Sequence, residues 1–235
     1  MQNPFKKGLS HGLPICLGYF SVSFGFGILA VKSGLLALEA IIISFTNLTS
    51  AGQAAGVGII AAGGTLIEMA ATQFVINLRY SLMGLSLSQK LSEKFTTPHR
   101  LLVSFGITDE IFAMAAAQKE KLVPSYMYGM IFISMLGWVG GTAAGAIAGT
   151  ALPAQITAAM GILLYGMFIA IIIPAARTNK KDFIVIVLAA IFSAIFKYLL
   201  PSVSFGFAII ISAVLAAVIG AILFPIKVAE TEDEA

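Results

Sequence analysis

Long stretches without a charged side chain are the feature of this sequence that most limits its fold. Leu13–Val31, Ala40–Ile67, Leu122–Ala176 and Tyr198–Ile226 contain no Asp, Glu, Lys, Arg or His. A membrane-spanning helix needs about 20 predominantly apolar residues, so the third stretch is long enough for two. Only 11% of the 235 residues are charged, against about 25% in soluble domains. The sequence therefore predicts an all-α, polytopic helical membrane protein.

Several other classes of protein are excluded by the same pattern. Seven or eight spans use roughly 140–160 residues, which leaves short loops and no room for a soluble catalytic domain. A β-barrel is disfavoured because its strands would alternate apolar and polar residues. The net charge of +3 comes from basic residues that lie between apolar runs, as in cytoplasmic loops, and does not indicate nucleic-acid binding. Cys16 is the single cysteine, so an internal disulfide is impossible.

We expect one transmembrane domain, residues 1–225, followed by an acidic cytoplasmic tail, residues 226–235. The amino terminus is expected to be cytoplasmic, because lysines precede the first span and basic clusters favour that side. The loop with Lys90, Lys94 and Arg100 would lie outside if every segment crossed; two re-entrant segments among the first four would move it inside. The count therefore stays at seven or eight spans. The predicted segments are Leu13–Val31, Ala40–Ala62, Thr65–Ser88, Leu101–Gln118, Ser125–Ala148, Gln155–Ala176, Phe183–Leu199 and Ser204–Phe224.

The second segment has a polar centre that weakens its helix propensity. Thr46–Gln53 contains Asn47, Thr49, Ser50 and Gln53 among few strong helix formers. Discontinuous helices of this kind place half-helix ends at the midplane of secondary transporters, where the positive N-terminal end can hold a carboxylate. The alternative is a continuous helix whose polar side chains bond to neighbouring helices. The sequence leaves both open and favours the broken helix.

Charged residues inside the third and fourth segments are the other candidates for a site. Glu68 and Arg79 share one helical face about 16 Å apart, too far to pair directly, and Asn77 lies beside Arg79 in sequence. Asp109 and Glu110 are adjacent in an apolar setting. Charges at membrane depth are costly and are usually paired and functional. One of two close carboxylates is readily protonated, which suits proton coupling. The alternative is a packing salt bridge from this acidic pair to Arg79 or Lys197.

Other motifs indicate packing. Gly141, Gly145 and Gly149 form two small-xxx-small steps that permit close helix contact. His11 and His99 lie outside the predicted spans and far apart, so we expect no metal site. No cofactor is expected, because the sequence contains no phosphate-binding loop or dinucleotide fingerprint.

Four motifs follow one another along the first half of the chain: Gly12–Pro14 with Gly18–Tyr19, Ser50–Ala55, Asn77–Gly84 and Thr108–Phe112. In this order they resemble the AzlC family of branched-chain amino acid permeases, the large subunit of a bacterial two-component exporter. The resemblance implies a bacterial inner-membrane exporter of valine, leucine, isoleucine or related amino acids. It also implies a small AzlD-type membrane subunit as partner. The chain departs from the family in having Tyr80 where histidine is common after the arginine.

The two lines of reasoning combine into a hypothesis for a secondary transporter, not an enzyme. Asn47, Thr49, Ser50, Gln53, Asn77 and Arg79 are the predicted substrate-binding residues. Asp109, Glu110 and Glu68 are predicted to bind the ammonium group or carry the coupling proton. Phe24, Phe45, Ile107 and Phe112 are candidates for an apolar lining. A structural or regulatory subunit, whose buried charges only fix packing and assembly, is the alternative; a channel and an intramembrane enzyme are less favoured.

Overall fold

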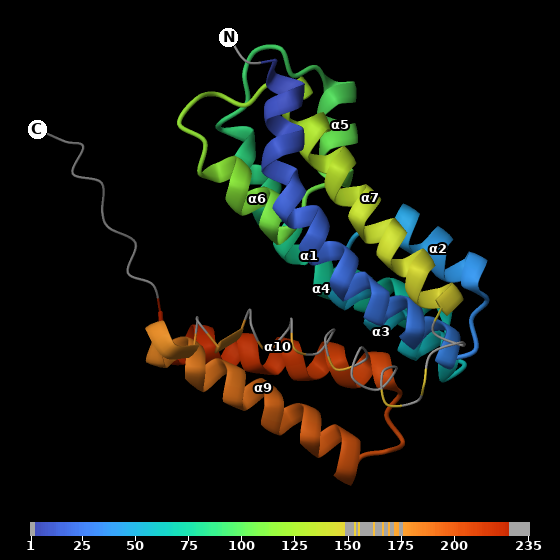
Figure 1. Ribbon diagram of the computed structural model, residues 1–235. Coiled ribbons are helices and arrows are strands. Elements are labelled where there is room, and N and C mark those ends of the chain that lie inside the picture. The colour runs from blue at the N-terminus through green and yellow to red at the C-terminus, as the bar shows by residue number, and fades with distance from the viewer. Residues whose placement is uncertain are drawn as a thin grey trace, which may run out of the picture. The chain divides into compact units, whose positions relative to one another are not determined.

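The computed structural model of the chain describes residues 3–148 and 176–225. Between these ranges it describes Pro153, Gln155, Ile162, Gly166, Ile169, Ile172 and Ile173. Within these residues the regular structure is helical, apart from one isolated β-bridge between Leu91 and Leu122. The chain divides into two units, Met1–Met167 and Phe168–Ala235 (Figure 1). The all-α prediction is confirmed for the described part; the tail, residues 226–235, lies outside it.

Four of the described helices are long and apolar enough to cross a membrane: α1, α7, α9 and α10. Two shorter apolar helices, α2 and α3, follow α1, and α4 is long but carries Glu68 and Arg79. The helices are α1 (Pro4–Lys32), α2 (Ala37–Thr46), α3 (Ser50–Ala61), α4 (Leu66–Ser88), α5 (Thr97–Phe105), α6 (Asp109–Ala116), α7 (Pro124–Ala148), α9 (Lys180–Leu199) and α10 (Phe205–Leu223).

Helix α1 begins nine residues before the predicted span Leu13–Val31. The side chain of Asn3 accepts a hydrogen bond from the Phe5 amide at 3.0 Å, and Pro4 stands at the first helical position, where its missing N–H costs nothing. The helix continues through Pro14 and ends before Gly34, whose φ of +94° suits glycine. The first span is therefore confirmed as a helix and is longer than predicted.

Helices α1 and α7 run parallel and in close contact through glycines. A Cβ on Gly8 would collide with the backbone of Tyr126, one on Gly137 with Cys16, and one on Gly145 with Phe24. The residue numbers of the contacting pairs increase together along both helices, so the two helices start at the same end of the unit (Figure 1). Lys6 and Lys7 lie at the start of α1, and Lys119 and Lys121 precede α7. We call this end of the unit the basic end, and the opposite end, where α1 and α7 finish, the far end. The small-residue prediction is confirmed for Gly141 and Gly145; Gly149 lies outside the described residues.

The predicted span Ala40–Ala62 is broken. Residues Asn47–Thr49 separate α2 from α3, and Asn47 is extended at φ −148° and ψ 108°. Ala40 and Val57 share a hydrophobic cluster with Ala30 and Ala146, near the far ends of α1 and α7. Leu48 instead joins Tyr19 and Trp138, at the middle of those helices. The segment is therefore a hairpin that enters from the far end and returns there; the broken alternative is correct.

The predicted span Leu101–Gln118 is also not one helix. It consists of α5, which already begins at Thr97, and α6, with Gly106–Thr108 between them. The Ser92 amide donates to the Leu122 carbonyl at 2.9 Å, and the Leu122 amide donates to the Lys90 carbonyl at 2.8 Å. The two ends of the α5–α6 segment therefore lie side by side. This second hairpin starts and returns at the basic end, and its tip, Gly106–Thr108, points into the unit.

Helix α4 joins the bases of the two hairpins and confirms the predicted helix Thr65–Ser88. It follows Gly63, whose φ is +68°, and Thr65 caps it by accepting from the Glu68 amide at 3.1 Å. Near its other end, Leu87 packs in one cluster with Phe95 and Leu122 of the basic end. The helix thus runs from the far end to the basic end, opposite to α1 and α7.

In the second unit, α9 and α10 pack against each other, and a Cβ on Gly220 would meet Val185 at 2.6 Å. The two helices confirm helical structure at the predicted spans Phe183–Leu199 and Ser204–Phe224. The predicted span Gln155–Ala176 lies mostly outside the described residues. Whether residues 1–225 form a single domain stays a prediction.

Candidate functional site

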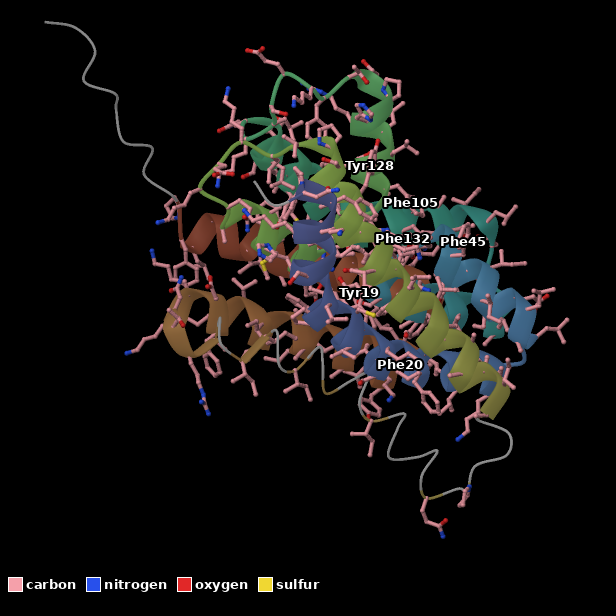
Figure 2. The ribbon with its side chains drawn as sticks, turned by 45° about the horizontal axis from the view of Figure 1, so that its top comes forward. Tyr19, Phe20, Phe45, Phe105, Tyr128 and Phe132 are labelled. Carbon is pink, nitrogen blue, oxygen red and sulfur yellow. The ribbon has the colours of Figure 1, made fainter. Side chains whose placement is uncertain are left out.

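The tips of the two hairpins approach each other around Tyr19 of α1. Leu48 of the first tip, Tyr19 and Ile111 of α6 belong to one buried hydrophobic cluster. The Tyr19 hydroxyl reaches the second tip, and its ring stands edge-on to Trp138, with 5.2 Å between ring centroids. Figure 2 labels Tyr19 on α1 together with aromatic residues of neighbouring helices. Two interruptions far apart in sequence therefore meet in one region.

Arg79 and Asp109 form an ion pair in this region, with 2.7 Å between Nη1 and Oδ2. The pair joins the middle of α4 to the first residue of α6. Arg79 also donates to the Tyr80 hydroxyl at 3.3 Å and lies 5.0 Å from the centre of that ring. The side chains are 38% and 31% exposed in the isolated chain, so neither charge is fully buried. The packing alternative named Arg79 or Lys197 as the partner, and the partner is Arg79.

Glu110, the next residue, has a different partner. The Tyr19 hydroxyl donates to Glu110 Oε2 at 2.5 Å and lies 2.5 Å from the Thr108 hydroxyl. Thr108 caps α6 by accepting from the Ile111 amide at 3.4 Å. Both carboxylates thus stand in the first turn of α6, where the partial positive charge of a helix N-terminus favours an anion. Their side chains bind to two different elements, as expected for adjacent positions on a helix.

Gln53 is 1% exposed and belongs to a chain of buried hydrogen bonds. Trp138 Nε1 donates to Gln53 Oε1 at 2.9 Å, and Gln53 Nε2 donates to Ser44 Oγ at 3.0 Å. Ser44 lies 2.7 Å from the Thr142 hydroxyl. These bonds fasten both limbs of the first hairpin to α7. The predicted substrate-binding role of Gln53 stays a prediction, and its geometry makes it a positioning residue.

A second chain of hydrogen bonds joins the first hairpin to α4. Gln73 Nε2 donates to the Gly52 carbonyl at 2.7 Å, and Asn77 Nδ2 donates to Gln73 Oε1 at 3.2 Å. Thr49 precedes α3 without capping it. Thr49 Oγ1 and Asn77 Oδ1 are buried and have no hydrogen-bond partner among the described residues. Gln73 therefore ties the first tip to the helix that carries Arg79.

The other predicted residues are distributed along the first hairpin and α4. Asn47 ends α2 and Ser50 begins α3, so both flank the first break. Glu68 is 3% exposed in the first turn of α4, and a Cβ on Gly64 would meet its Oε2 at 2.8 Å. Eleven residues separate it from Arg79, about 16 Å along the helix. The structure therefore gathers Asn47, Thr49, Ser50, Asn77, Arg79, Asp109 and Glu110 around the two tips and leaves Glu68 at the far end.

Two aromatic residues of the site were not among the predicted site residues. Tyr19 links Glu110 to α1, and Trp138 links Gln53 to α7. Tyr19 lies within a motif of the family resemblance, which was the available signal; Trp138 lies in none of those motifs. Of the expected apolar lining, Ile107 and Phe112 pack against the cluster of Tyr19, whereas Phe45, labelled in Figure 2, is 59% exposed.

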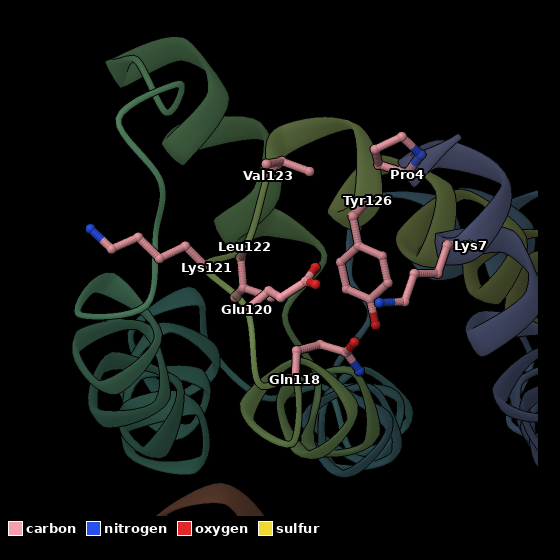
Figure 3. A pocket seen from close by; sticks show the side chains of 8 residues that line it. All are labelled: Pro4, Lys7, Gln118, Glu120, Lys121, Leu122, Val123 and Tyr126. Atoms are coloured by element: carbon pink, nitrogen blue, oxygen red, sulfur yellow. The ribbon is translucent and has the colours of Figure 1, made fainter. Parts of the chain in front are cut away.

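Two cavities lie nearer the basic end. One of about 170 Å³ is bordered by polar residues, among them Lys7, Glu120 and Tyr126 (Figure 3). It lies away from the paired charges of the tips. The other, of about 270 Å³, is almost entirely apolar and extends along the second hairpin from Leu122 to Ile107, the residue before Thr108. An apolar cavity therefore adjoins the second tip.

In the part of the chain that the structure describes, no group of three or more His, Cys, Asp or Glu side chains is arranged to hold a metal ion. The two histidines bond instead to tyrosines at the start of α7, His11 to Tyr126 at 2.9 Å and His99 to Tyr128 at 2.6 Å.

Comparisons with known proteins agree with a membrane protein of this kind. The chain is 31% identical over 185 residues to the inner membrane protein YgaZ of Escherichia coli, covering 75% of each chain. It is 31% identical over 172 residues to an uncharacterized membrane protein of Archaeoglobus fulgidus, covering 72% of this chain and 75% of the other. It is 22% identical over 182 residues to the branched-chain amino acid transport protein AzlC of Bacillus subtilis, covering 76% and 70%. No solved structure matches the chain. The family model described as AzlC protein matches residues 14–152, which include both hairpins and the ion pair, and the chain belongs to the AzlC family.

Proposed function

We propose that the first unit crosses the membrane three times, through α1, α4 and α7, and enters it twice without crossing. The parallel packing of α1 and α7 supports this, because both helices then leave from the same side. The backbone bonds between Lys90, Ser92 and Leu122 bring the end of α4 to the start of α7. Each hairpin returns to the end from which it came. Non-helical backbone at its tip is tolerated in a membrane because protein surrounds it.

This topology removes the disagreement over the basic loops. The predicted span Gln155–Ala176, with α9 and α10, raises the total to six crossings, so two of the eight apolar segments do not cross. Lys6–Lys7, Lys90–Arg100, Lys119–Lys121 and Arg177–Lys181 then all lie on one side, with Lys227. By the excess of basic residues in cytoplasmic loops, that side is the cytoplasm of a bacterial cell. The amino terminus is therefore cytoplasmic.

The protein is, on this proposal, a secondary transporter that exports valine, leucine, isoleucine or other hydrophobic amino acids. The ion pair Arg79–Asp109 beside two helix breaks is the observation that carries the proposal. Ionised side chains at membrane depth typically mark a substrate or ion pathway. The printed name of the Bacillus relative, a branched-chain amino acid transport protein, supports the substrate class.

A zwitterion has the right charges to compete for this pair. Its carboxylate takes the Arg79 guanidinium and the first-turn amides of α3 beginning at Ser50, where the helix dipole favours an anion. Loss of Arg79 as partner then frees Asp109. The apolar cavity that adjoins Ile107 suits an aliphatic side chain. Asn47 and Thr49 border the same tip, and Gln53 holds it in place.

Asp109 and Glu110 are the acidic groups of the proposal. They serve either the substrate ammonium or a coupling proton. Two adjacent carboxylates do not both ionise easily, so one of them takes up a proton when Arg79 turns to the substrate. Glu110 already accepts a hydrogen bond from the Tyr19 hydroxyl at 2.5 Å. Proton-driven export follows as the coupling mode. Glu68, at the far end of α4, is a further candidate for the proton pathway.

A small AzlD-type membrane subunit is the proposed partner. Within the first unit, α4 carries large exposed apolar side chains, among them Leu66, Phe74 and Leu82. Lipid, another part of the chain or an apolar subunit must cover them in the membrane. The half-exposed Arg79 and Asp109 stand on the same helix and the adjoining α6, where lipid alone would be unfavourable.

The second candidate is a structural or regulatory subunit whose charges serve only packing and assembly. The buried bonds of Gln53 with Trp138 and Ser44 favour it, because they fasten elements and leave no group free. The two functions differ in what neutralising Arg79 or Asp109 changes. A transporter loses flux while its assembly persists; a structural subunit loses assembly.

Reconstitution into liposomes tests the transport proposal. The purified protein is reconstituted into liposomes, with and without the small subunit, and the liposomes are loaded with radiolabelled valine. Valine efflux is then followed with and without an imposed pH gradient. Efflux that is faster than in protein-free liposomes supports transport, and its acceleration by the imposed pH gradient supports proton coupling. Efflux that ignores the pH gradient contradicts the coupling, and efflux equal to protein-free liposomes contradicts transport.

A further inference from the structure

The first hairpin tip and α4 bring together side-chain oxygens, of which Thr49 Oγ1 and Asn77 Oδ1 have no hydrogen-bond partner among the described residues. We propose that Thr49 Oγ1, Gln73 Oε1 and Asn77 Oδ1 form a subsite for a small monovalent cation. We call these three atoms the oxygen niche. The ligand is the ammonium group of the transported amino acid or a sodium ion, which share this chemistry. The ammonium assignment rests on the proposed function and deepens it.

The orientation of both amides in the niche follows from one backbone carbonyl. The Gly52 carbonyl can only accept, so the group that Gln73 presents to it at 2.7 Å must be the Nε2 donor. Gln73 Oε1 therefore faces Asn77 and must meet the Nδ2 donor, at 3.2 Å. Asn77 Oδ1 is then the atom left over. The atom of the Gly52–Gln73–Asn77 hydrogen-bond chain that lacks a partner is thus an acceptor oxygen, whichever way either side-chain amide was first assigned.

Thr49 Oγ1 and Gln73 Oε1 lie close together, and the Asn77 amide adjoins the Gln73 oxygen. A Cβ on Gly52 would collide with Thr49 Oγ1 and would meet Gln73 Oε1 at 2.5 Å, so these two oxygens flank one point. Asn77 is hydrogen-bonded to that same Gln73 oxygen. Thr49 Oγ1 and Asn77 Oδ1 are buried without a partner among the described residues. A buried unsatisfied acceptor is costly, and a bound cation removes that cost.

Thr49 differs from the other threonines that precede helices in having a hydroxyl that is both buried and uncommitted. Thr96, before α5, also makes no cap hydrogen bond, but it is exposed to solvent. Thr65 and Thr108 both accept from the first turn of their helices, at 3.1 and 3.4 Å. Thr49 stands at the same position before α3 and makes no such bond. Its oxygen is therefore available to a ligand, beside the unwound backbone of Asn47–Thr49. Unwound backbone and half-helix ends at such breaks are known to hold small cations in membrane transporters.

The niche changes the assignment of charges in the site. Neutral acceptor oxygens repel a carboxylate and attract an ammonium group. If the ammonium lies at the niche, its carboxylate can reach the free amides at the start of α3, which begins with the next residue, Ser50. Asp109 and Glu110 are then released from binding the ammonium and serve the proton alone.

Binding measurements on the purified full-length protein test the niche. Thr49→Val and Asn77→Leu each remove a niche oxygen at nearly constant size. Thr46→Val is the matched control, because the Thr46 hydroxyl already donates to the Ile42 carbonyl at 2.8 Å. Losing a hydrogen bond to a charged group weakens binding by about tenfold or more. We expect that loss of leucine affinity in Thr49→Val and Asn77→Leu, none in Thr46→Val, and recovery in Thr49→Ser.

The source of the cation is separated by two further probes. The keto acid 4-methyl-2-oxopentanoate keeps the carboxylate and side chain of leucine but lacks the ammonium. If the niche holds the ammonium, the affinity for this keto acid is the same in wild type and in Thr49→Val. If the niche holds sodium, leucine affinity in wild type rises when choline chloride is replaced by sodium chloride, and Thr49→Val loses that rise.

Failure of the niche and failure of the proposed function give different results. Wild-type leucine affinity in both Thr49→Val and Asn77→Leu, with no effect of sodium, overturns the niche while transport stands. If wild type binds no hydrophobic amino acid, the transport proposal fails instead. The niche is then judged by the melting temperature in sodium against choline chloride. A rise in wild type that is absent in Thr49→Val supports it, and equal responses overturn it.

Discussion

Arg79 of α4 and Asp109 of α6 form an ion pair at 2.7 Å between two interrupted helical segments. Asp109 stands in the first turn after the second break, and α4 is bound to the first hairpin by Gln73, which donates to the Gly52 carbonyl. The pair therefore connects the elements that carry the two tips. Breaking the pair leaves each charge without its partner. An amino acid zwitterion can replace either one, because it carries both a carboxylate and an ammonium group.

A double-mutant cycle separates the packing and transport roles of this pair. Arg79→Gln and Asp109→Asn each leave one charge without its partner, so each should lower the melting temperature. The double variant removes both charges and should regain most of that loss, with a coupling energy of about 0.5–3 kcal/mol. Strictly additive losses would contradict a direct interaction. A double variant that also transported at the wild-type rate would favour the structural alternative.

Removing the Tyr19 hydroxyl should impair transport more than stability. Tyr19→Phe keeps the ring against Trp138 but takes the donor from Glu110, at an expected cost of about 1–3 kcal/mol if the acceptor stays unsatisfied. We expect the transport rate and its pH dependence to change. Tyr128→Phe is the control, because it loses a hydrogen bond to His99 at the basic end. Equal effects of both variants on transport would contradict a special role for Tyr19.

Two neighbouring glycines of α7 should differ in their tolerance of a methyl group. A Cβ on Gly141 would collide with the Phe20 carbonyl and the Ser23 hydroxyl of α1, whereas a Cβ on Gly140 would meet only the Phe20 ring at 3.9 Å. Gly141→Ala should therefore lower the melting temperature and the yield of monodisperse protein, and Gly140→Ala should change neither. Equal stability of the two variants would contradict the close α1–α7 contact.

The two hairpin bases should react from opposite sides of the membrane. In a Cys16→Ala background, single cysteines at Leu36 and Ala62, both exposed and at negative φ, mark the base of the first hairpin, and cysteines at Lys94 and Glu120 mark the second. A membrane-impermeant maleimide added to intact cells should label the first two positions. The other two should react only after the cells are opened. Labelling of Lys94→Cys in intact cells would contradict the re-entrant second hairpin.

The sequence predicted the helical membrane class and favoured a break within Thr46–Gln53, because apolar runs and polar interruptions are local features. It did not predict the second break. Gly106 and Thr108 are ordinary in helices of membrane proteins, and only the backbone pairing of Leu122 with Lys90 and Ser92 reveals the return of the chain. The partners within the site were equally out of reach. Tyr19 and Glu110 are 91 residues apart, and their contact depends on how the hairpins pack.

The amphipathic spacing along α4 also had limits. It placed Glu68 and Arg79 on one face at the correct separation but did not show which of them meets the neighbouring segments. Packing decides this: Glu68 is buried at the far end beside Gly64, and Arg79 meets the tip of the second hairpin. Because only 11% of the residues are charged, the sequence offers few candidate site residues. Tertiary contacts then show which of these candidates come together.

Exchange of radiolabelled leucine into leucine-loaded proteoliposomes tests most directly whether the meeting point of the hairpin tips is a transport site. Wild-type protein, Arg79→Ala and Glu110→Gln are reconstituted in equal, monodisperse amounts, each with the small subunit. We expect the wild type to accumulate label and both variants to match protein-free liposomes. Exchange at the wild-type rate by both variants would contradict the site at Arg79 and Glu110.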